Sequence, residues 1–270
     1  MKVIAIIIGI VIFLVLLLRL GVLIQPTPFP AYPGRSAVLE TVPLPEGLPA
    51  PVERFYHQTY GDEIPVIHSA VISGRATLNI NGITLPSRFR FTHEAGKGYR
   101  HYFESTLFGL PLMKVNEHYL DGKGRLDLSI LGVSEGPKID QAANLGMWAE
   151  YGMFPSIWVT DPRVRWEPVD EETALLRIPY GEEEQTFVAR FDSDSGMLRY
   201  LEVMRYRDAD SVSKILWIAE SVEYTTVDGD RLMTKGSATW LDQGKPWATF
   251  TAEDIVYNVD VSEYIRATGP

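Results

Sequence analysis

The sequence contains no cysteine among its 270 residues. A disulfide framework, a thiol nucleophile, an iron–sulfur cluster and a cysteine-ligated zinc site are therefore excluded. Basic residues are also scarce: without Lys2 and Arg19 in the N-terminal apolar run, residues 25–270 hold 23 lysines and arginines against 35 acidic residues, a net charge of −12. Nucleic acid and anionic lipid surfaces repel a domain of this charge. We therefore expect no nucleic-acid partner.

Histidine is scarce too, and its positions argue against a serine hydrolase. The pattern Gly132-Val133-Ser134-Glu135-Gly136 matches the G-x-S-x-G nucleophile elbow, which needs an acid and then a histidine later in the chain. All five histidines precede Ser134, namely His57, His68, His93, His101 and His118. Because the required order cannot be met, we interpret the pattern as a turn and assign no catalytic residue.

Sequence motifs for metal binding are lacking as well. The chain has no H-E-x-x-H helix, no H-x-H pair and no complete calcium loop. The neighbouring pairs His93-Glu94 and Glu117-His118 would point to opposite faces of a strand, because side chains alternate along it. We therefore predict no metal site and no cofactor.

The chain does have a long apolar run at its start. Residues 3–24 are apolar or glycine apart from Arg19, and as a helix they extend roughly 33 Å, enough for a hydrocarbon core of about 30 Å. A cleaved signal would be shorter and followed by a small-x-small site, which the next residues do not offer. We predict a single transmembrane anchor over residues 3–24 in the cell membrane, with the globular domain on the extracytoplasmic side.

Proline is concentrated directly after this run. Residues 25–51 contain eight prolines, and because proline fixes φ and lacks a backbone donor, such a stretch sustains neither helix nor sheet for long. We predict a semi-rigid stalk over residues 25–50, part of which can pack back on the domain. No second stretch of this composition follows, so residues 51–270 are predicted to form one domain.

Two helices are predicted inside this domain. The first follows Pro51, where VERFYHQTY places apolar residues at helical spacing. The second spans residues 138–154, bracketed by Pro137 and Pro155. One stripe of this second helix combines Ile139, Ala142, Ala143, Gly146, Met147, Glu150 and Phe154.

Glu150 is the unusual member of that stripe. A carboxylate on an otherwise apolar helix face needs a partner once it is buried. We predict a structural ion pair with Arg190, with Arg177 and Arg205 as alternative partners. A catalytic acid is the weaker interpretation.

The rest of the domain is rich in strand signals. Alternating or β-branched runs are separated by Asn81-Gly82, Asp121-Gly122, Ser195-Gly196 and Asp228-Gly229, dipeptides that close antiparallel hairpins. Between residues 66 and 259 the pattern gives about ten or eleven strands with nearly no room for crossover helices. We predict a mainly β (α+β) fold, one large curved antiparallel sheet packed on one or two helices, with a cleft between helix and strands.

The order of these features resembles a known family. Its members share a Y-x-D-G-x-G turn, a helical glutamate followed by a proline, and a later tryptophan. The matching residues here are Tyr119, Asp121, Gly122, Gly124, Glu150, Pro155 and Trp166. The chain looks like a member of the uncharacterised bacterial, often membrane-anchored DUF6544 and DUF6920 type, of unknown function. That architecture is similar to the LolA and LppX lipoprotein-carrier half-barrel.

The resemblance implies a module that binds a lipid or another hydrophobic ligand without catalysis. The spanning helix favours a tethered receiver or chaperone over a soluble shuttle. The candidate ligand-binding residues are Tyr56, Met147, Trp148, Tyr151, Trp158 and Trp166. An accessory subunit that docks on a membrane protein complex is the alternative, and a hydrolase of unknown type is the weakest of the three.

Overall fold

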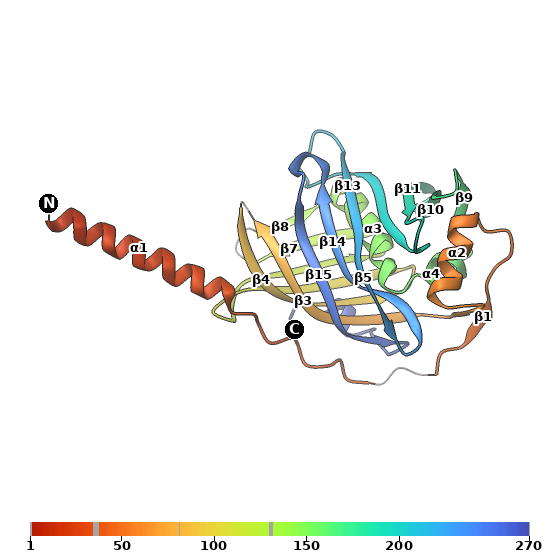
Figure 1. The fold of residues 1–270 in the computed structure, drawn as a ribbon, viewed down its shortest axis with the longest axis horizontal. Coiled ribbons are helices and arrows are strands. Elements are labelled where there is room, and N and C mark those ends of the chain that lie inside the picture. Colours follow the sequence, from red (N-terminus) through yellow and green to blue (C-terminus); the bar gives the residue numbers. More distant parts are fainter. Residues whose placement is uncertain (1, 35–37, 81, 130–131, 270) are drawn as a thin grey trace.

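The computed structural model describes residues 2–34, 38–80, 82–129 and 132–269 (Figure 1). Its α-helices are α1 (Lys2–Leu23), α2 (Ala50–Thr59), α3 (Pro137–Glu150) and α4 (Ile157–Thr160), and its short 3₁₀ helices are η1 (Tyr151–Met153), η2 (Leu241–Gln243) and η3 (Tyr264–Arg266). The strands are β1 (Thr41–Pro43), β2 (Glu63–Pro65), β3 (Ser69–Ile80), β4 (Ile83–Glu94), β5 (Gly98–Leu107), β6 (Leu110–Leu120), β7 (Lys123–Leu128), β8 (Gly132–Glu135), β9 (Arg165–Pro168), β10 (Thr173–Tyr180), β11 (Glu183–Phe191), β12 (Leu198–Arg205), β13 (Ile215–Val227), β14 (Asp230–Trp240) and β15 (Pro246–Tyr257).

One antiparallel sheet dominates the domain. In the described residues it has 13 strands in the order β8-β7-β6-β5-β4-β3-β15-β14-β13-β12-β11-β10-β9. Each half is a meander of neighbouring hairpins, and the pairing of β3 with β15 joins the halves. The predicted mainly β class with one large antiparallel sheet is confirmed. The strand number exceeds the expected ten or eleven, in part because the short strands β8 and β9 lack a clear alternating pattern.

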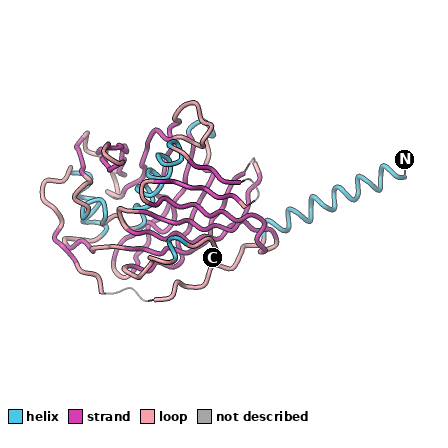
Figure 2. The backbone as a smooth tube through the Cα atoms, turned by 180° about the vertical axis from the view of Figure 1, so that it is seen from behind, coloured by secondary structure: helices cyan, strands magenta, loops and turns pink. Residues whose placement is uncertain are grey.

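The sheet curls around α3. This helix contacts β7 and β8 near one end of the strand order, and β10 and β12 near the other end. A flat sheet could not bring both ends to one helix, so the strands form a half-barrel with α3 on its inner side (Figures 1 and 2). The right-handed twist of neighbouring strands supplies this curvature.

The helix predictions hold in outline. Pro51 lies in the first turn of α2, whose buried face is Val52, Phe55, Tyr56 and Thr59. The helix predicted over residues 138–154 runs from Pro137 to Glu150 and continues as η1. Burial of this helix is not confined to the predicted apolar stripe, because every residue from Ile139 to Ala149 is buried.

Three buried polar residues of α3, Asp140, Gln141 and Asn144, all have hydrogen-bond partners. Asp140 accepts the backbone N–H of Gly124 at 2.8 Å. Asn144 donates to the carbonyl oxygen of Pro179 at 3.1 Å, and Gln141 donates to that of Met204 at 3.2 Å. A helix enclosed by a sheet needs such partners on several sides, because unpaired buried polar groups are costly.

Hairpin turns are present at Asp121 and Asp228 as predicted, whereas the residues of the G-x-S-x-G pattern form a strand and not a turn. Asp121 and Asp228 both adopt positive φ before a glycine, as a two-residue hairpin turn requires. Asn81 of the predicted Asn-Gly turn lies outside the described residues. The turn predicted at Gly132–Gly136 is instead the edge strand β8, which pairs with β7.

The outer face of β4 and β5 is covered rather than wet. Arg90 alternates with the inward-facing Phe89 and Phe91, yet it is only 7% exposed. Its guanidinium donates to the carbonyl oxygen of Pro30, and the neighbouring Arg88 lies 4.5 Å over the ring of Phe29. Residues 26–34 therefore follow the domain surface, and later in the same proline-rich segment β1 pairs with β2.

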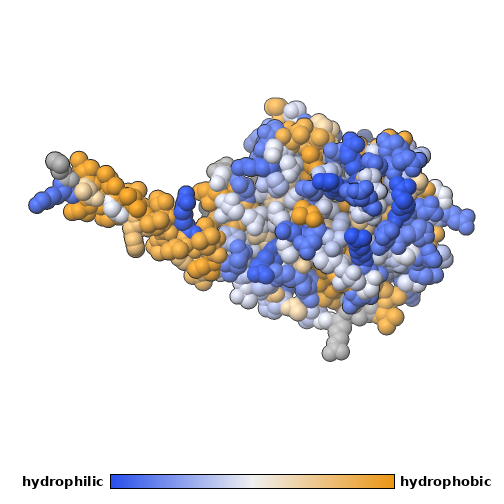
Figure 3. Space-filling view, viewed as in Figure 1, coloured by the Kyte–Doolittle hydropathy of each residue, from blue (hydrophilic) through white to orange (hydrophobic). Residues whose placement is uncertain are grey.

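The N-terminal helix α1 projects from the domain (Figures 1 and 3). It has a mean hydropathy of 3.2 over its most apolar window, and by length and composition it could cross a membrane. Its last turn touches the hairpin between β5 and β6, where the backbone N–H of Phe108 donates to Gly21 at 2.9 Å. The end of the apolar helix is thus fixed directly to one end of the sheet.

Candidate functional site

The inner face of β4, β5 and β6 gathers aromatic and titratable side chains. His101 on β5 pairs with Phe91 on one side and with Glu117 on the other. Residues paired directly across a sheet project to the same face, so these three side chains share the concave surface. His93 and Tyr99, another cross-strand pair, extend the same row.

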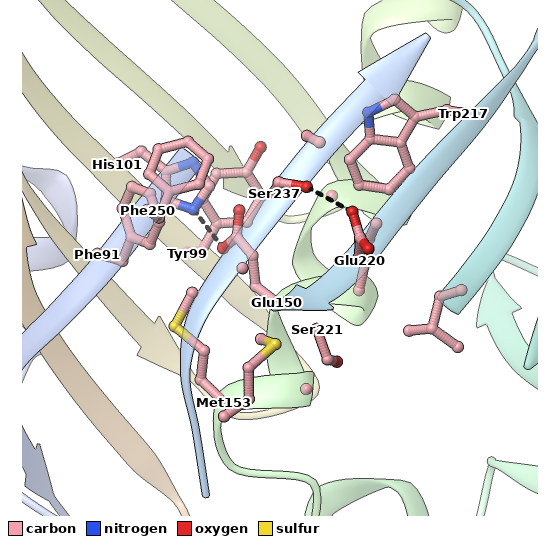
Figure 4. A pocket seen from close by; sticks show the side chains of 18 of the residues that line it. Phe91, Tyr99, His101, Glu150, Met153, Trp217, Glu220, Ser221, Ser237 and Phe250 are labelled. Carbon is pink, nitrogen blue, oxygen red and sulfur yellow. Dashed lines mark hydrogen bonds and ion pairs between the residues drawn. The ribbon is translucent and has the colours of Figure 1, made fainter. Parts of the chain in front are cut away.

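The carboxylate of Glu150 meets this row from the last turn of α3 (Figure 4). Its Oε2 lies 2.6 Å from Nε2 of His101 and 3.3 Å from Nε2 of His93. The His93 side chain is fully buried, the His101 side chain is 4% exposed, and Glu150 keeps 20% exposure. Helix and sheet are therefore joined by a buried polar contact.

Glu117 supports His101 from the opposite side. Its carboxylate accepts a hydrogen bond from the Tyr99 hydroxyl at 2.5 Å, and its other oxygen lies 3.8 Å from Nδ1 of His101. His101 thus stands between two carboxylates, with one ring nitrogen toward each.

These contacts shift the pKa values of the cluster. Burial alone would lower the pKa of His101, but the Glu150 and Glu117 carboxylates outweigh it and raise the pKa to about 9. Burial would raise the pKa of Glu150, yet His101 and His93 lower it to about 2. Burial lowers the pKa of His93 despite the nearby Glu150. At pH 7 the favoured state is an anionic Glu150 beside a protonated His101 and a neutral His93.

Arg205, at the end of β12, brings a positive charge to the same interior. Its guanidinium lies 4.5 Å from the ring centre of Trp217 and 5.7 Å from that of Trp240. Its Nε has no hydrogen-bond partner among the described residues. Burial lowers the pKa of Arg205, while Glu117, Tyr99 and Glu150 oppose that shift. Within the part of the chain that the structure describes, aromatic faces hold the guanidinium and no direct ion pair does.

Two adjoining cavities lie between α3 and the sheet. The first has a volume of about 100 Å³ and is lined by Phe91, His101, Glu150, Leu201, Trp217 and Phe250 among others (Figure 4). The second has a volume of about 290 Å³ and is lined by Leu78, Val115, Leu126, Ile139, Ala142 and Trp240 among others. Both contain Phe103, Glu117, Arg205 and Trp247 in their walls, so the two spaces meet at Arg205 and Glu117.

The predicted cleft is therefore present, but other residues line it. On α3, Gly146, Ala149 and Glu150 line the first cavity and Ile139, Ala142 and Ala143 line the second, whereas Met147, Trp148 and Tyr151 occupy the remaining sides of the helix. A helix turns by about 100° per residue, so neighbouring positions face different surroundings. The stripe predicted from the sequence contains five of these six cavity-lining residues, all but Ala149, so helical spacing identified the side of α3 that borders the cavities.

The six predicted ligand-binding residues pack instead as core. Tyr56 donates to the carbonyl oxygen of Pro155 at 2.7 Å, and Trp158 donates to that of Trp148 at 3.1 Å. The Tyr151 hydroxyl accepts the backbone N–H of Gly96 at 2.9 Å. Trp166 packs edge-on against Trp158, and Met147 is 2% exposed. All six are described residues, and the walls of the two cavities contain none of them.

The ion pair predicted between Glu150 and Arg190 is replaced by the contacts with His101 and His93. Arg190 binds Glu202 at 2.6 Å, and its side chain is 52% exposed. The reason lies in the strand pairing: Arg190 and its partner Tyr200 fall on the outer face of neighbouring strands. The alternative Arg177 binds Glu167, and Arg205 shares the interior with Glu150 without a direct contact.

One sequence pattern indicates part of this site, namely alternation along the strand that carries His93. Phe89, Phe91 and His93 alternate along one strand, which places both aromatics and the histidine on one face. His101 comes from the neighbouring strand, so pairs of residues within one strand do not predict its place beside His93. Among the described residues, His93, His101 and Glu150 form a group whose ligand atoms lie within 4.8 Å of one another and could hold a metal ion.

Residues 38–252 match the model of DUF6544, described as a family of unknown function. No curated protein matches the chain. A DUF1329 family protein from Desulfovibrio piger is 13% identical at a TM-score of 0.42, covering 73% of this chain and 89% of that chain. A LolA superfamily protein from Nitrosomonas europaea is 9% identical at a TM-score of 0.47, covering 82% of this chain and 99% of that chain. An outer membrane lipoprotein-sorting protein domain from Vibrio parahaemolyticus is 12% identical at a TM-score of 0.41, covering 79% and 93%.

Proposed function

The chain belongs to the DUF6544 family, whose function is unknown, and from the geometry of its interior we propose that it is a membrane-tethered, non-catalytic binding protein for a lipid-derived or other apolar ligand. The observation that carries this proposal is the pair of adjoining cavities between α3 and the sheet. Apolar hollows with few convergent polar groups are the usual form of small-molecule sites.

The size of the cavities limits the ligand. With volumes of about 100 and 290 Å³, the two together fall at the lower end of the range of about 300–1,000 Å³ that holds drug-sized ligands. A single alkyl chain or a compact apolar molecule fits this volume better than a diacyl lipid.

Arg205 favours a ligand with an anionic end. It stands where the two cavities meet, and its Nε lacks a hydrogen-bond partner among the described residues. A guanidinium in low-dielectric surroundings is stabilised most by a carboxylate or phosphate that accepts two hydrogen bonds from it in a bidentate arrangement. We expect a fatty acid or another single-chain anion to place its charged end here.

The position of α1 supports a membrane source for the ligand. Its last turn contacts the β5–β6 hairpin. Close to that hairpin, Ile83, Leu110 and Leu112 have exposed fractions of 61%, 70% and 51%. The second cavity reaches the same end of the sheet through Ile80, which is 36% exposed. A chain leaving the outer leaflet would reach the cavity without crossing much water.

Ligand binding is tested with the purified full chain in an amphipol that carries no free alkyl detergent. Increasing concentrations of oleate and of oleyl alcohol displace a fluorescent fatty acid, and bound fluorescence is followed. We expect both to compete at one molecule per chain, and oleate to compete about tenfold better. The variant Arg205→Met should lose the preference for the acid, and Arg190→Met, at an exposed ion pair, should retain it.

Two results would contradict the proposal. If neither compound displaces the probe, and native mass spectrometry of protein taken directly from membranes shows no bound lipid, the cavity-binding function is wrong. A docking role on a membrane protein complex would then be the remaining candidate. If binding persists but Arg205→Met leaves the acid preference unchanged, the assignment of the anionic end to Arg205 is wrong.

A further inference from the structure

We propose that His93, His101 and Glu150 form a binding site for a divalent transition-metal cation of the Zn²⁺ type. This metal site is separate from the proposed function of binding an apolar ligand. Two of its residues, His101 and Glu150, line the first cavity, as Arg205 does. Three different elements supply the side chains: β4, β5 and the last turn of α3.

The distances suit a small cation. Ligand atoms in a tetrahedral zinc site with bonds of about 2.0–2.1 Å lie about 3.4 Å apart. Nε2 of His93 and Oε2 of Glu150 are already 3.3 Å apart, and all three ligand atoms lie within 4.8 Å of one another. The 2.6 Å contact between His101 and Glu150 would lengthen as the cation replaces the proton between them.

The surroundings of His101 resemble those of a metal-bound histidine. Metal-ligating histidines usually present their second ring nitrogen to a carboxylate, which fixes the ring and its tautomer. Glu117 holds this position, with Oε2 at 3.8 Å from Nδ1 of His101. The Tyr99 hydroxyl in turn donates to the other oxygen of Glu117. An orienting shell is therefore built around one of the three proposed ligands.

His93 provides an independent observation. Its side chain is fully buried, and neither ring nitrogen has a hydrogen-bond partner of good geometry among the described residues. Buried polar atoms without partners are rare in native proteins and call for an explanation. An imidazole nitrogen that has no hydrogen-bond partner is free to bind a metal ion.

The chemistry of the site selects the cation. Two imidazoles and one carboxylate suit Zn²⁺ and its neighbours in the first transition row, whereas Ca²⁺ and Mg²⁺ prefer oxygen ligands alone. His101 and Glu150 also line the first cavity, so a fourth position would face that space. Glu117 and Glu150 offset the charges of Arg205 and of the cation in part.

The experiment uses the purified full chain, stripped of metal by a chelator and then dialysed. Co²⁺ is added first, because tetrahedral cobalt gives strong visible absorption bands, and Zn²⁺ binding is measured by calorimetry. We expect one ion per chain and displacement of Co²⁺ by Zn²⁺. The ligand variants His93→Gln, His101→Gln and Glu150→Gln should each weaken binding by at least about tenfold, and Glu117→Gln by about 10–100-fold.

His118→Gln is the matched control. His118 lies next to Glu117 on β6 and therefore projects to the opposite face of the strand. The His118→Gln variant should bind both cations with the affinity of the wild type. If His118→Gln weakens binding as much as the ligand variants, or the cobalt spectrum stays octahedral and weak, the proposed site is wrong.

A second measurement is independent of whether the variants fold. X-ray absorption spectroscopy of the wild-type chain with one equivalent of Zn²⁺ should give a first shell of nitrogen and oxygen, with the outer-shell scattering of two imidazoles. A first shell without imidazole scattering would overturn the proposal. The oleate competition described above, repeated on metal-free protein, separates the two ideas because it requires no cation.

Discussion

Nε2 of His101 on β5 and Oε2 of Glu150 on α3 lie 2.6 Å apart and join the enclosed helix to the concave face of the sheet. The contact forms at the end of the helix, beside the first cavity. It therefore both fixes α3 and gives the cavity a polar wall. Removal of either partner would leave a buried charge or donor unpaired, which is the costly outcome.

Glu150→Gln should lower stability in metal-free protein. Breaking one side of a buried pair costs about 3 kcal/mol, which for a domain of this size corresponds to a fall in Tm of about 6–12 °C. Glu202→Gln is the control, because its partner Arg190 is 52% exposed and exposed pairs contribute about 0–1 kcal/mol. Thermal unfolding followed by circular dichroism measures both, and equal shifts would refute the structural role of the Glu150 contact.

Filling the second cavity should weaken ligand binding without unfolding the protein. Ala142 lines that cavity of about 290 Å³, so Ala142→Phe places a ring where the ligand would lie. We expect oleate affinity to fall by at least about tenfold and Tm to change by a few degrees, since the ring enters space rather than packed core. Ala50→Phe, at an exposed position of α2, should leave affinity unchanged. Full affinity in Ala142→Phe would place the ligand elsewhere.

The contact between α1 and the domain depends on a small residue. A Cβ atom on Gly21 would come within 2.6 Å of Leu107 Cδ1 and 2.8 Å of the Phe108 ring, whereas one on Gly9 would meet nothing within 4 Å. Gly21→Leu should therefore separate the helix from the β5–β6 hairpin and speed hydrogen exchange in residues 105–110. Gly9→Leu should not. Unchanged exchange in both variants would show that the hairpin does not depend on α1.

Asp230, at the start of β14, should make the stability of the protein depend on pH. Burial, followed by repulsion from Asp228, raises the pKa of Asp230 above its ordinary value. The folded state therefore keeps the proton to a higher pH than the unfolded chain, and stability falls as pH rises from the unfolded pKa through the folded pKa. Asp230→Asn should raise Tm at pH 7 and lose this advantage below about pH 4.

Asp121→Asn is the control for this effect, because Asp121 is an exposed aspartate in a turn of the same kind as that of Asp228, with φ of 52°. Thermal scans from pH 3 to pH 8 compare both variants with the wild type. If Asp230→Asn gains no stability at neutral pH, burial does not disfavour the charged form of Asp230.

The absence of cysteine makes the predicted topology simple to test. Ser213 is exposed between β12 and β13, so Ser213→Cys provides the only thiol in the chain. A membrane-impermeant maleimide should label it in cells whose outer barrier is permeabilised and whose inner membrane is intact. Labelling only after lysis of the inner membrane would place the domain in the cytoplasm and contradict the proposed location.

Much of the fold could be predicted from local pattern. The Asp-Gly dipeptides fix hairpin turns because aspartate and glycine tolerate positive φ, and alternation along β4 fixes which residues share a face. The apolar run of residues 3–24 follows from length and composition alone. These features depend on near neighbours in the chain, and all can be read without knowing what packs against them.

The candidate site depended on contacts that sequence spacing does not encode. His101 and Glu150 are 49 residues apart and meet only because the sheet curls around α3. The predicted stripe of α3 already contained most of its cavity wall, but enclosure buries all sides of the helix, so the choice between Met147 and Gly146 within that stripe could not come from hydropathy. Arg190 was excluded as a partner by strand register alone, since a strand's period of two sends alternate side chains to opposite faces. Local chemistry thus determined the elements, and the curvature of the sheet decided which side chains meet inside it.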